Sequence, residues 1–357
     1  MKNSSVITRR NFLTTSLLGG IAASTVGLRR GACVAAEAAS TPRPTRVAVM
    51  AGDDRADNVF RGLKGFEKEI KQAIGSRRVV LKPNNVSIEH QLAATHADCL
   101  EATLEFLKSI GKLGNVVVAE SAGNGPTLDG FANYRYTRLA DKYRVKLVDL
   151  DQEEFDLVHV FDEKDFRPHA VRMSRRLLDP NAFIISAAKL KTHDRVVATL
   201  SLKNIILGAP IKDLGFRWGG GGKPGAKTDK PITHGSGFRG LNFNLFALAQ
   251  RLHPHLSIID GFDGMQGNGP VGGTAVDHRV CIVGMDWLAA DRVAVELMGI
   301  DYAKVGYLNY CAQARLGEGD LNKIEIVGAR IADHIKPYKL HDNVEQQLIW
   351  MKPAQPA

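Results

Sequence analysis

Paired cysteines are missing from this chain of 357 residues. The four cysteines, Cys33, Cys99, Cys281 and Cys311, lie far apart, and none forms a C-x-x-C pair. The three that follow the N-terminal region are odd in number, which argues against a disulfide framework, and their spacing fits no in-chain iron–sulfur cluster. We expect them to be buried apolar thiols.

The usual signatures of nucleotide and ester hydrolysis are also absent. Directly after the glycine-rich run Gly219–Lys223, Pro224 stands where a Walker motif needs serine or threonine. The glycines of Met265–Gly273 allow a ligand to approach the backbone closely, but this segment does not match the Rossmann fingerprint. The sequence also contains no G-x-S-x-G motif, the nucleophile elbow of esterases. No internal repeat is visible. No second long apolar run follows the N-terminal one, so we expect no permanent membrane span.

The N-terminus has the order of a twin-arginine export signal. Arg9 and Arg10 precede a moderately apolar stretch, Leu13–Leu28, and small residues follow. We predict a signal peptide at 1–38, use of the twin-arginine translocase, and a periplasmic or other extracytoplasmic location. An uncleaved N-terminal anchor is the alternative.

Two further features of this region bear on the partners of the chain. Cys33 is a poor lipoprotein site, because Arg30 stands three residues before it, where a small aliphatic residue is needed. The formal net charge is +9, and residues 1–36 carry five positive charges and no negative ones, so the remainder carries +4. This modest and interspersed charge predicts no nucleic-acid partner, and it is compatible with a small anionic ligand.

Beyond a linker at 39–45, the chain alternates short apolar runs with amphipathic helices. We predict one α/β domain at 46–335, followed by a C-terminal tail at 336–357. Continuous apolar runs are typical of strands covered on both faces, and the alternation favours a mostly parallel sheet with helices on both faces, a Rossmann-like layering. The predicted strands are Arg46–Met50, Arg78–Leu81, Asn115–Ala119, Val145–Leu150, Ala182–Ser186, Leu256–Ile259, Val280–Val283 and Ile324–Val327.

Two helices and one long loop are predicted in more detail. A capping-box-like pattern begins a helix at Thr95 that ends at Gly111, and a second helix covers Asp286–Met298. The glycine-rich segment Gly208–Gly240 has no periodicity. A loop of that length is usually a lid, a binding loop or a disordered excursion.

Polar side chains follow four of the predicted strands. Because ligands bind beyond the carboxyl ends of parallel strands, these groups are the candidate site. We assign catalytic roles to His193, Glu120, Lys191 and Asp260. We assign ligand or cofactor binding to Lys82, Asn84, Asn85, Lys203, Asn204, Gly267, Asn268 and Gly269.

Each assignment has a structural alternative. Lys82-Pro83-Asn84-Asn85 also reads as a turn, and Glu120 as a solvated acid at a strand end. His193 is either a structural hydrogen bonder or a neutral base, since the neighbouring lysines would lower its pKa. His193 and His234 could form a two-histidine, one-carboxylate metal set with Asp260 or Asp263, of which Asp263 is preferred, although no spacing motif supports it.

The order of these motifs resembles the family called domain of unknown function 362. The residues that carry the resemblance are Lys82-Pro83-Asn84, His96-Ala97-Asp98, Lys189–His193, Thr199–Asn204 with Gly208, Asp260-Gly261, Gly267–Pro270, and Asp286 with Ala290-Asp291. The resemblance implies an α/β domain and a role in binding a cofactor or metal, without an established reaction. Some relatives carry ferredoxin-like cysteine clusters, which this chain lacks. Gln266 stands where relatives often have glutamate.

Two functional hypotheses follow. The first is an exported enzyme acting on a small anionic substrate, in which lysines bind the anion and His193 or Glu120 moves a proton. The second is a non-catalytic carrier or assembly protein for a metal or organic cofactor. A surface interaction module is less favoured, because such modules seldom gather lysine, histidine and acids at one edge.

Overall fold

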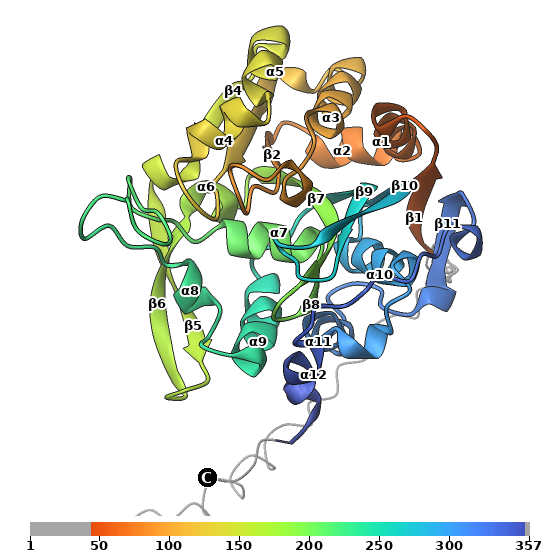
Figure 1. Cartoon of the computed structure of the whole chain (residues 1–357). Coiled ribbons are helices and arrows are strands. Elements are labelled where there is room, and N and C mark those ends of the chain that lie inside the picture. The colour runs from red at the N-terminus through yellow and green to blue at the C-terminus, as the bar shows by residue number, and fades with distance from the viewer. Residues whose placement is uncertain (1–43, 354–357) are drawn as a thin grey trace, which may run out of the picture. The chain divides into compact units, whose positions relative to one another are not determined.

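A nine-stranded mixed sheet runs through residues 44–353, the part of the chain that the computed structural model describes (Figure 1). The strand order is β11-β1-β10-β9-β7-β2-β3-β4, and β8 pairs with β7. The run from β9 to β4 is parallel, as is the β1–β11 pair, whereas β10 is antiparallel to both neighbours. The strands are β1 (Thr45–Ala51), β2 (Arg78–Lys82), β3 (Val116–Glu120), β4 (Lys146–Asp149), β7 (Ala182–His193), β8 (Val197–Thr199), β9 (Leu256–Gln266), β10 (Thr274–Gly284) and β11 (Ile324–Gly328).

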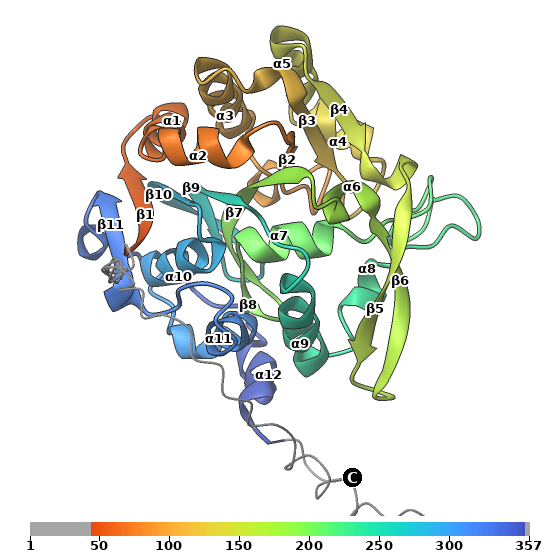
Figure 2. The same ribbon diagram turned by 180° about the vertical axis from the view of Figure 1, so that it is seen from behind.

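Helices cover both faces of the sheet, because successive strand residues point to opposite sides. In β2, Val79 and Leu81 join one buried cluster and Val80 joins the other. The first cluster packs under α1 (Arg55–Lys64), α2 (Glu67–Ile74), α3 (Ala97–Ser109), α4 (Thr127–Asn133) and α5 (Tyr136–Tyr143). The second packs under α7 (Ser201–Gly208), α9 (Phe238–Ala249), α10 (Trp287–Leu297) and α11 (Gly306–Gln313), on the opposite side of the sheet (Figures 1 and 2). The predicted fold class is confirmed.

The eight predicted strands are all present, but β7, β9 and β10 each extend at least six residues beyond the predicted bounds. Strand β7 continues through His193 and β9 through Gln266, so polar residues predicted to follow strands lie within them. The antiparallel hairpin of β5 (Phe155–Asp162) and β6 (Arg167–Ser174) was not predicted. In β5 only Val158 and Val160 are buried, and the exposed side chains of Leu157 and His159 alternate with them, so the strand has no continuous buried run.

The helix predicted from Thr95 begins two residues later, at Ala97. His96 is its N-cap, and its ring Nδ1 accepts the backbone N–H of Asp98 at 3.2 Å. Thr95 instead forms hydrogen bonds to two other segments. Its hydroxyl accepts the N–H of Asn84, which follows β2, and donates to the carbonyl of Ala187 in β7. The capping-box interpretation was therefore wrong. The second predicted helix, α10, is confirmed with Asp286 as its N-cap.

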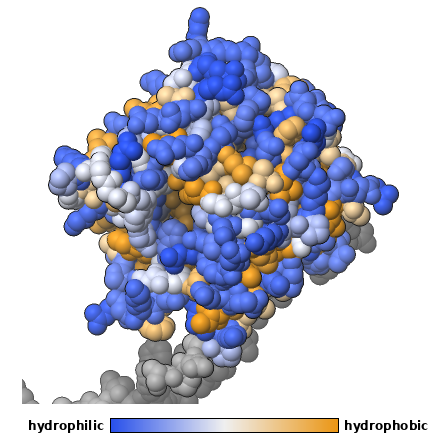
Figure 3. Space-filling model, in the orientation of Figure 1, coloured by the Kyte–Doolittle hydropathy of each residue, from blue (hydrophilic) through white to orange (hydrophobic). Residues whose placement is uncertain are grey.

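The glycine-rich segment is partly ordered into helix. A short helix, α8 (Lys230–Thr233), lies within it, and α9 begins before its predicted end. Figure 3 shows mainly hydrophilic side chains on this side of the molecule, with apolar ones near the centre and in several separate places around it. The remaining short helices are α6 (Arg175–Leu178) and α12 (Val344–Gln347).

The C-terminal segment packs onto the end of β7. The side chain of Gln347 accepts the N–H of Val197 at 2.7 Å and donates to the carbonyl of His193 at 3.0 Å. The predicted signal peptide at 1–38 lies outside the described residues. Within 44–353, no helix is long and apolar enough to cross a membrane.

Candidate functional site

A cavity of about 720 Å³ opens at the carboxyl ends of β2, β3 and β7. Helices α7 and α8 and the turn after β9 supply its other walls. Its volume lies in the range of pockets that bind small organic molecules. The charged and imidazole side chains lining it are Lys82, Glu89, Glu120, Lys164, Lys191, Lys203, Lys230, His90, His193, His234, Asp194 and Arg195. Four of the lysines, Lys82, Lys191, Lys203 and Lys230, are buried, and Glu120 is the buried carboxylate among them.

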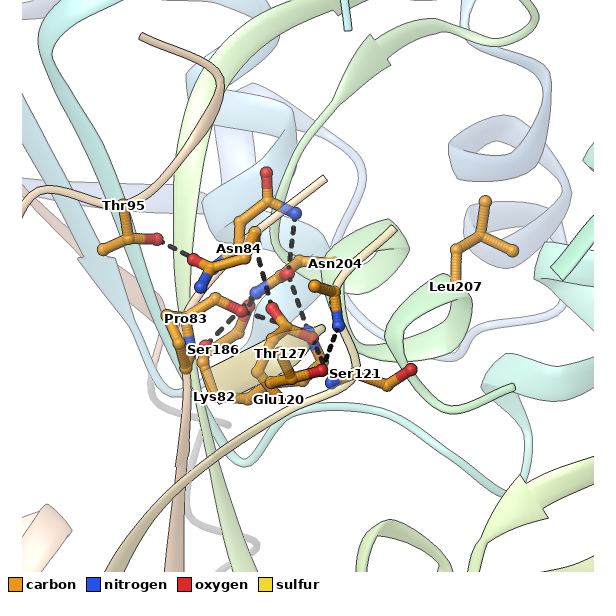
Figure 4. Close-up of polar contacts among 12 residues, drawn as sticks. Lys82, Pro83, Asn84, Thr95, Glu120, Ser121, Thr127, Ser186, Asn204 and Leu207 are labelled. Atoms are coloured by element: carbon orange, nitrogen blue, oxygen red, sulfur yellow. Dashed lines mark hydrogen bonds and ion pairs between the residues drawn. The ribbon is translucent and has the colours of Figure 1, made fainter. Parts of the chain in front are cut away.

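Lys82 and Glu120 form an ion pair at the base of the cavity (Figure 4). Their charged atoms are 2.7 Å apart, and both side chains are at most 2% exposed. Glu120 also accepts the backbone N–H groups of Asn85 and Ser121, at 2.9 and 2.8 Å. Burial lowers the pKa of Lys82, and the charge of Glu120 opposes that shift. Glu120 is therefore a fixed acceptor that positions Lys82, and it has little freedom to act as a base.

Asparagines hold this pair in place and leave polar atoms free. Asn204 of α7 accepts from Lys82 at 3.2 Å and from Asn84 Nδ2 at 2.9 Å. Asn84 Oδ1, Asn85 Nδ2 and Thr199 Oγ1 are buried without a hydrogen-bond partner among the described residues. Because buried polar atoms are nearly always paired, unpartnered atoms on three cavity-lining residues favour ligand binding.

Lys203 differs from the other buried lysines of the cavity. Lys191 Nζ donates to the carbonyls of Ala93 and Pro270, at 2.9 and 3.4 Å, and Lys230 Nζ to that of Pro210 at 2.8 Å. Lys203 Nζ makes no hydrogen bond or ion pair with any residue in the described range. Burial lowers the pKa of Lys203 and of Lys230 to about 7, and that of Lys191 well below its usual value.

His193 and His234 present opposite hydrogen-bonding groups. His193 Nδ1 accepts the N–H of Arg195 at 3.0 Å, so a neutral ring carries its proton on Nε2. His234 Nδ1 donates to the carbonyl of Lys230 at 2.6 Å, which leaves Nε2 as an acceptor. Burial, aided by the charge of Lys203, lowers both pKa values, that of His234 to about 3. His193 therefore offers a hydrogen-bond donor and His234 a neutral, weakly basic acceptor, whereas the sequence suggested His193 as the base.

Helix α7 brings Lys203 and Asn204 to the cavity. Its first N–H groups, of Ser201 and Leu202, bind the buried carboxylate of Asp291 at 2.8 and 3.1 Å. Burial raises the pKa of Asp291 to about 7. At the other end of α7, a Cβ on Gly208 would lie 2.0 Å from Lys82 Cε, so only glycine leaves room for that lysine.

Two predicted acids lie outside the cavity lining. Asp260 is in the middle of β9, where Arg55 Nε donates to it at 3.3 Å and Lys189 Nζ lies 3.5 Å away. Burial favours a higher pKa for Asp260, but Lys189 and Arg55 outweigh it and lower the pKa. Asp263 pairs with the same Arg55. The structure brings neither acid to His193.

The predicted metal set is likewise not assembled. His193 and His234 line the cavity together, but Asp263 does not join them. Within residues 44–353, no group of three histidine, cysteine, aspartate or glutamate side chains is placed to hold a metal ion. The three described cysteines are free and buried, as expected.

The predicted backbone site at Gly267, Asn268 and Gly269 contacts the C-terminal segment. Gly267 N–H donates to the carbonyl of Lys339, and Asn268 Nδ2 donates to Asp342. Gln266 Oε1 accepts the N–H of Lys339 at 3.0 Å. The next residues, Pro270 and Val271, line the cavity, whereas the glycines do not.

Lys230 and Trp218 are among the cavity residues that sequence reasoning missed. Lys230 lies four residues before His234, a spacing that places both on one side of a helical turn. Trp218 comes from the glycine-rich segment, and its backbone and ring N–H groups donate to Asn124 and Gly123 at the end of β3. No periodicity marks either residue in the sequence.

Fold and site together define an α/β protein with a lysine-rich cavity at the carboxyl ends of parallel strands. A family model described as Domain of unknown function (DUF362) matches residues 79–296, and the chain belongs to that family. The chain is also similar to a curated protein of Synechocystis sp. (strain ATCC 27184 / PCC 6803 / Kazusa) named a thylakoid-associated protein. The two are 24% identical over 242 residues, which cover 67% of this chain and 68% of the relative.

Proposed function

We propose that this protein is an enzyme that binds a small anionic substrate in the lysine-rich cavity and moves a proton on it. The observation that carries the proposal is the excess of buried lysines over carboxylates, four lysines around Glu120, the one buried carboxylate among the described residues that line the cavity. Burial disfavours the charged form of an amine, and a bound anion would offset that cost by pairing with the ammonium groups.

The roles differ from one side chain to the next. Lys82, fixed by Glu120, is suited to hold an anionic group as a point charge, and Lys191 Nζ, fixed by two carbonyls, is suited to donate a hydrogen bond to it. His234 Nε2 is suited to accept a proton and His193 Nε2–H to donate one. A cavity with separate charge-binding and proton-moving groups favours an enzyme over a passive carrier.

A screen of small metabolites by thermal shift tests this function. Anionic compounds should raise the melting temperature, because a ligand that binds only the folded state stabilises it, and their neutral analogues should not. For a compound that is turned over, His193→Ala and Lys203→Ala should abolish turnover while the circular dichroism spectrum stays unchanged. Lys68→Met, on the exposed side of α2, is the matched control and should behave as wild type.

Two outcomes would contradict the proposal. One is a screen in which no anion raises the melting temperature. The other is full turnover in the His193 and Lys203 variants. Protein purified from its native compartment with a metal or chromophore at near-stoichiometric occupancy, and without turnover, would favour the carrier function instead.

We also propose export by the twin-arginine translocase. The support is the pair Arg9-Arg10 ahead of a weakly apolar stretch, followed by small residues that suit a signal peptidase. Replacing both arginines with lysine should keep the full-length chain in the cytoplasm, as cell fractionation and N-terminal sequencing would show. Recovery of the double variant outside the cytoplasm, shortened as in wild type, would contradict export by this route.

A further inference from the structure

The cavity contains a lysine whose amino group has no partner. Lys203 is 6% exposed and lies in the third position of α7, whose N-terminus is fixed by Asp291. Its Nζ faces the cavity and makes no hydrogen bond or ion pair within residues 44–353, whereas Lys82, Lys191 and Lys230 all donate to protein oxygens. The amino group is accessible from the cavity, so a ligand that enters the cavity can reach it.

Its surroundings favour the neutral amine, which is the nucleophilic form. Burial of the amino group is the largest cause of this preference, and the charge of Arg195 adds to it, whereas the half-exposed carboxylate of Asp194 opposes it. Desolvation and neighbouring cations are the two means by which proteins activate a lysine for attack on carbonyl compounds. Burial lowers the pKa of Lys203 to about 7, so a large share of the amine is neutral near that pH.

We propose that Lys203 forms an imine with the carbonyl carbon of an anionic oxo compound, a 2-oxo acid. This inference rests on the proposed function, because Lys82 and Lys191 would hold the carboxylate while Lys203 attacks the adjacent carbonyl. It adds the substrate class and a covalent step to that function.

The step balances without any oxidant or reductant. The lone pair of Lys203 Nζ forms the C–N bond, and the electrons of the C=O π bond move to the oxygen. Both hydrogens of the amine are then transferred to that oxygen, which leaves as water while the C=N bond forms. His234 Nε2 can accept a proton from the nitrogen, and His193 Nε2–H can deliver one to the oxygen.

Reductive trapping tests this directly on the whole mature protein. The protein is incubated with pyruvate, 2-oxoglutarate or phenylpyruvate and sodium cyanoborohydride, which reduces an imine to a stable secondary amine. We expect a near-stoichiometric label on Lys203 in peptide mass spectra, equal to the mass of the acid less one oxygen. Acetone, which lacks a carboxylate, should label Lys203 far less, and the exposed Lys68 serves as an internal reference for unspecific labelling.

A variant separates the amine from its charge. Lys203→Arg keeps a cation at this position but cannot form an imine, so the label should disappear while binding of oxalate, measured by calorimetry, is retained. No selective label on wild-type Lys203 with any of the three acids would overturn the imine. If oxalate still binds in that case, the anion cavity stands and only the covalent step fails. If neither occurs, both proposals fail.

Discussion

Glu120→Ala is expected to lower the free energy of unfolding by about 3–5 kcal/mol, because it leaves the charge of Lys82 buried without its partner. The two side chains are 1% and 2% exposed, so solvent screens their interaction much less than it screens a surface pair. The same substitution frees the N–H groups of Asn85 and Ser121, which Glu120 accepts in the wild type. Urea unfolding followed by circular dichroism measures the loss.

Two comparisons make this result specific. The double variant Lys82→Met with Glu120→Gln removes both charges and should recover part of the lost stability, since an uncharged pair carries no unpaired buried charge. Glu67→Ala breaks the exposed pair between Lys64 and Glu67, whose charged atoms are 2.6 Å apart, and should have no measurable effect. A wild-type free energy of unfolding for Glu120→Ala would show that Lys82 is not held as a buried ion.

Affinity for a simple anion is expected to fall as the pH rises above about 7. Burial gives Lys203 and Lys230 pKa values of about 7 in the empty cavity, and a bound anion raises both by favouring the ammonium form. Above pH 7, each of these lysines must therefore take up a proton before it can pair with the anion. Affinity should fall about tenfold per pH unit for each such lysine.

The stability of the empty protein should change in the opposite direction. The unfolded chain holds protons on these two lysines up to their ordinary pKa of 10.5, whereas the folded protein releases them near pH 7. Stability rises with pH wherever the unfolded state binds more protons, so these groups increase it from about pH 7 to 10.5. Two opposite trends with rising pH would therefore indicate buried lysines. The affinity for the anion should fall, and the free energy of unfolding of the empty protein should rise.

The sheet could be predicted from the sequence because most of its strands are continuous runs of apolar residues. The gathering of Lys82, Glu120 and His193 at one cavity follows from the same pattern, since parallel strands end at one edge. Asp260 breaks that rule. Strand β9 continues past Asp260 into a hairpin with β10, which places Asp260 opposite Lys189 in mid-strand rather than at an end.

The roles of individual side chains in the site could not be predicted, because they depend on local geometry that residue types alone do not specify. Whether His193 or His234 is the base depends on which ring nitrogen meets a backbone group, the N–H of Arg195 in one case and the carbonyl of Lys230 in the other. The role of Lys203 depends on the absence of a hydrogen-bond acceptor around its amino group within residues 44–353. Trp218 reaches the cavity only because two hydrogen bonds hold the glycine-rich segment at the end of β3.

Calorimetric titration with oxalate at pH 6 and pH 9 tests the anion-binding cavity most directly, because the charge of oxalate is constant over that range. We expect binding at pH 6 that weakens by at least about a hundredfold at pH 9, a smaller loss in Lys203→Met, and wild-type behaviour in Lys68→Met. Oxalate that fails to bind at pH 6, or that binds wild type and Lys203→Met with the same pH dependence, would contradict the account.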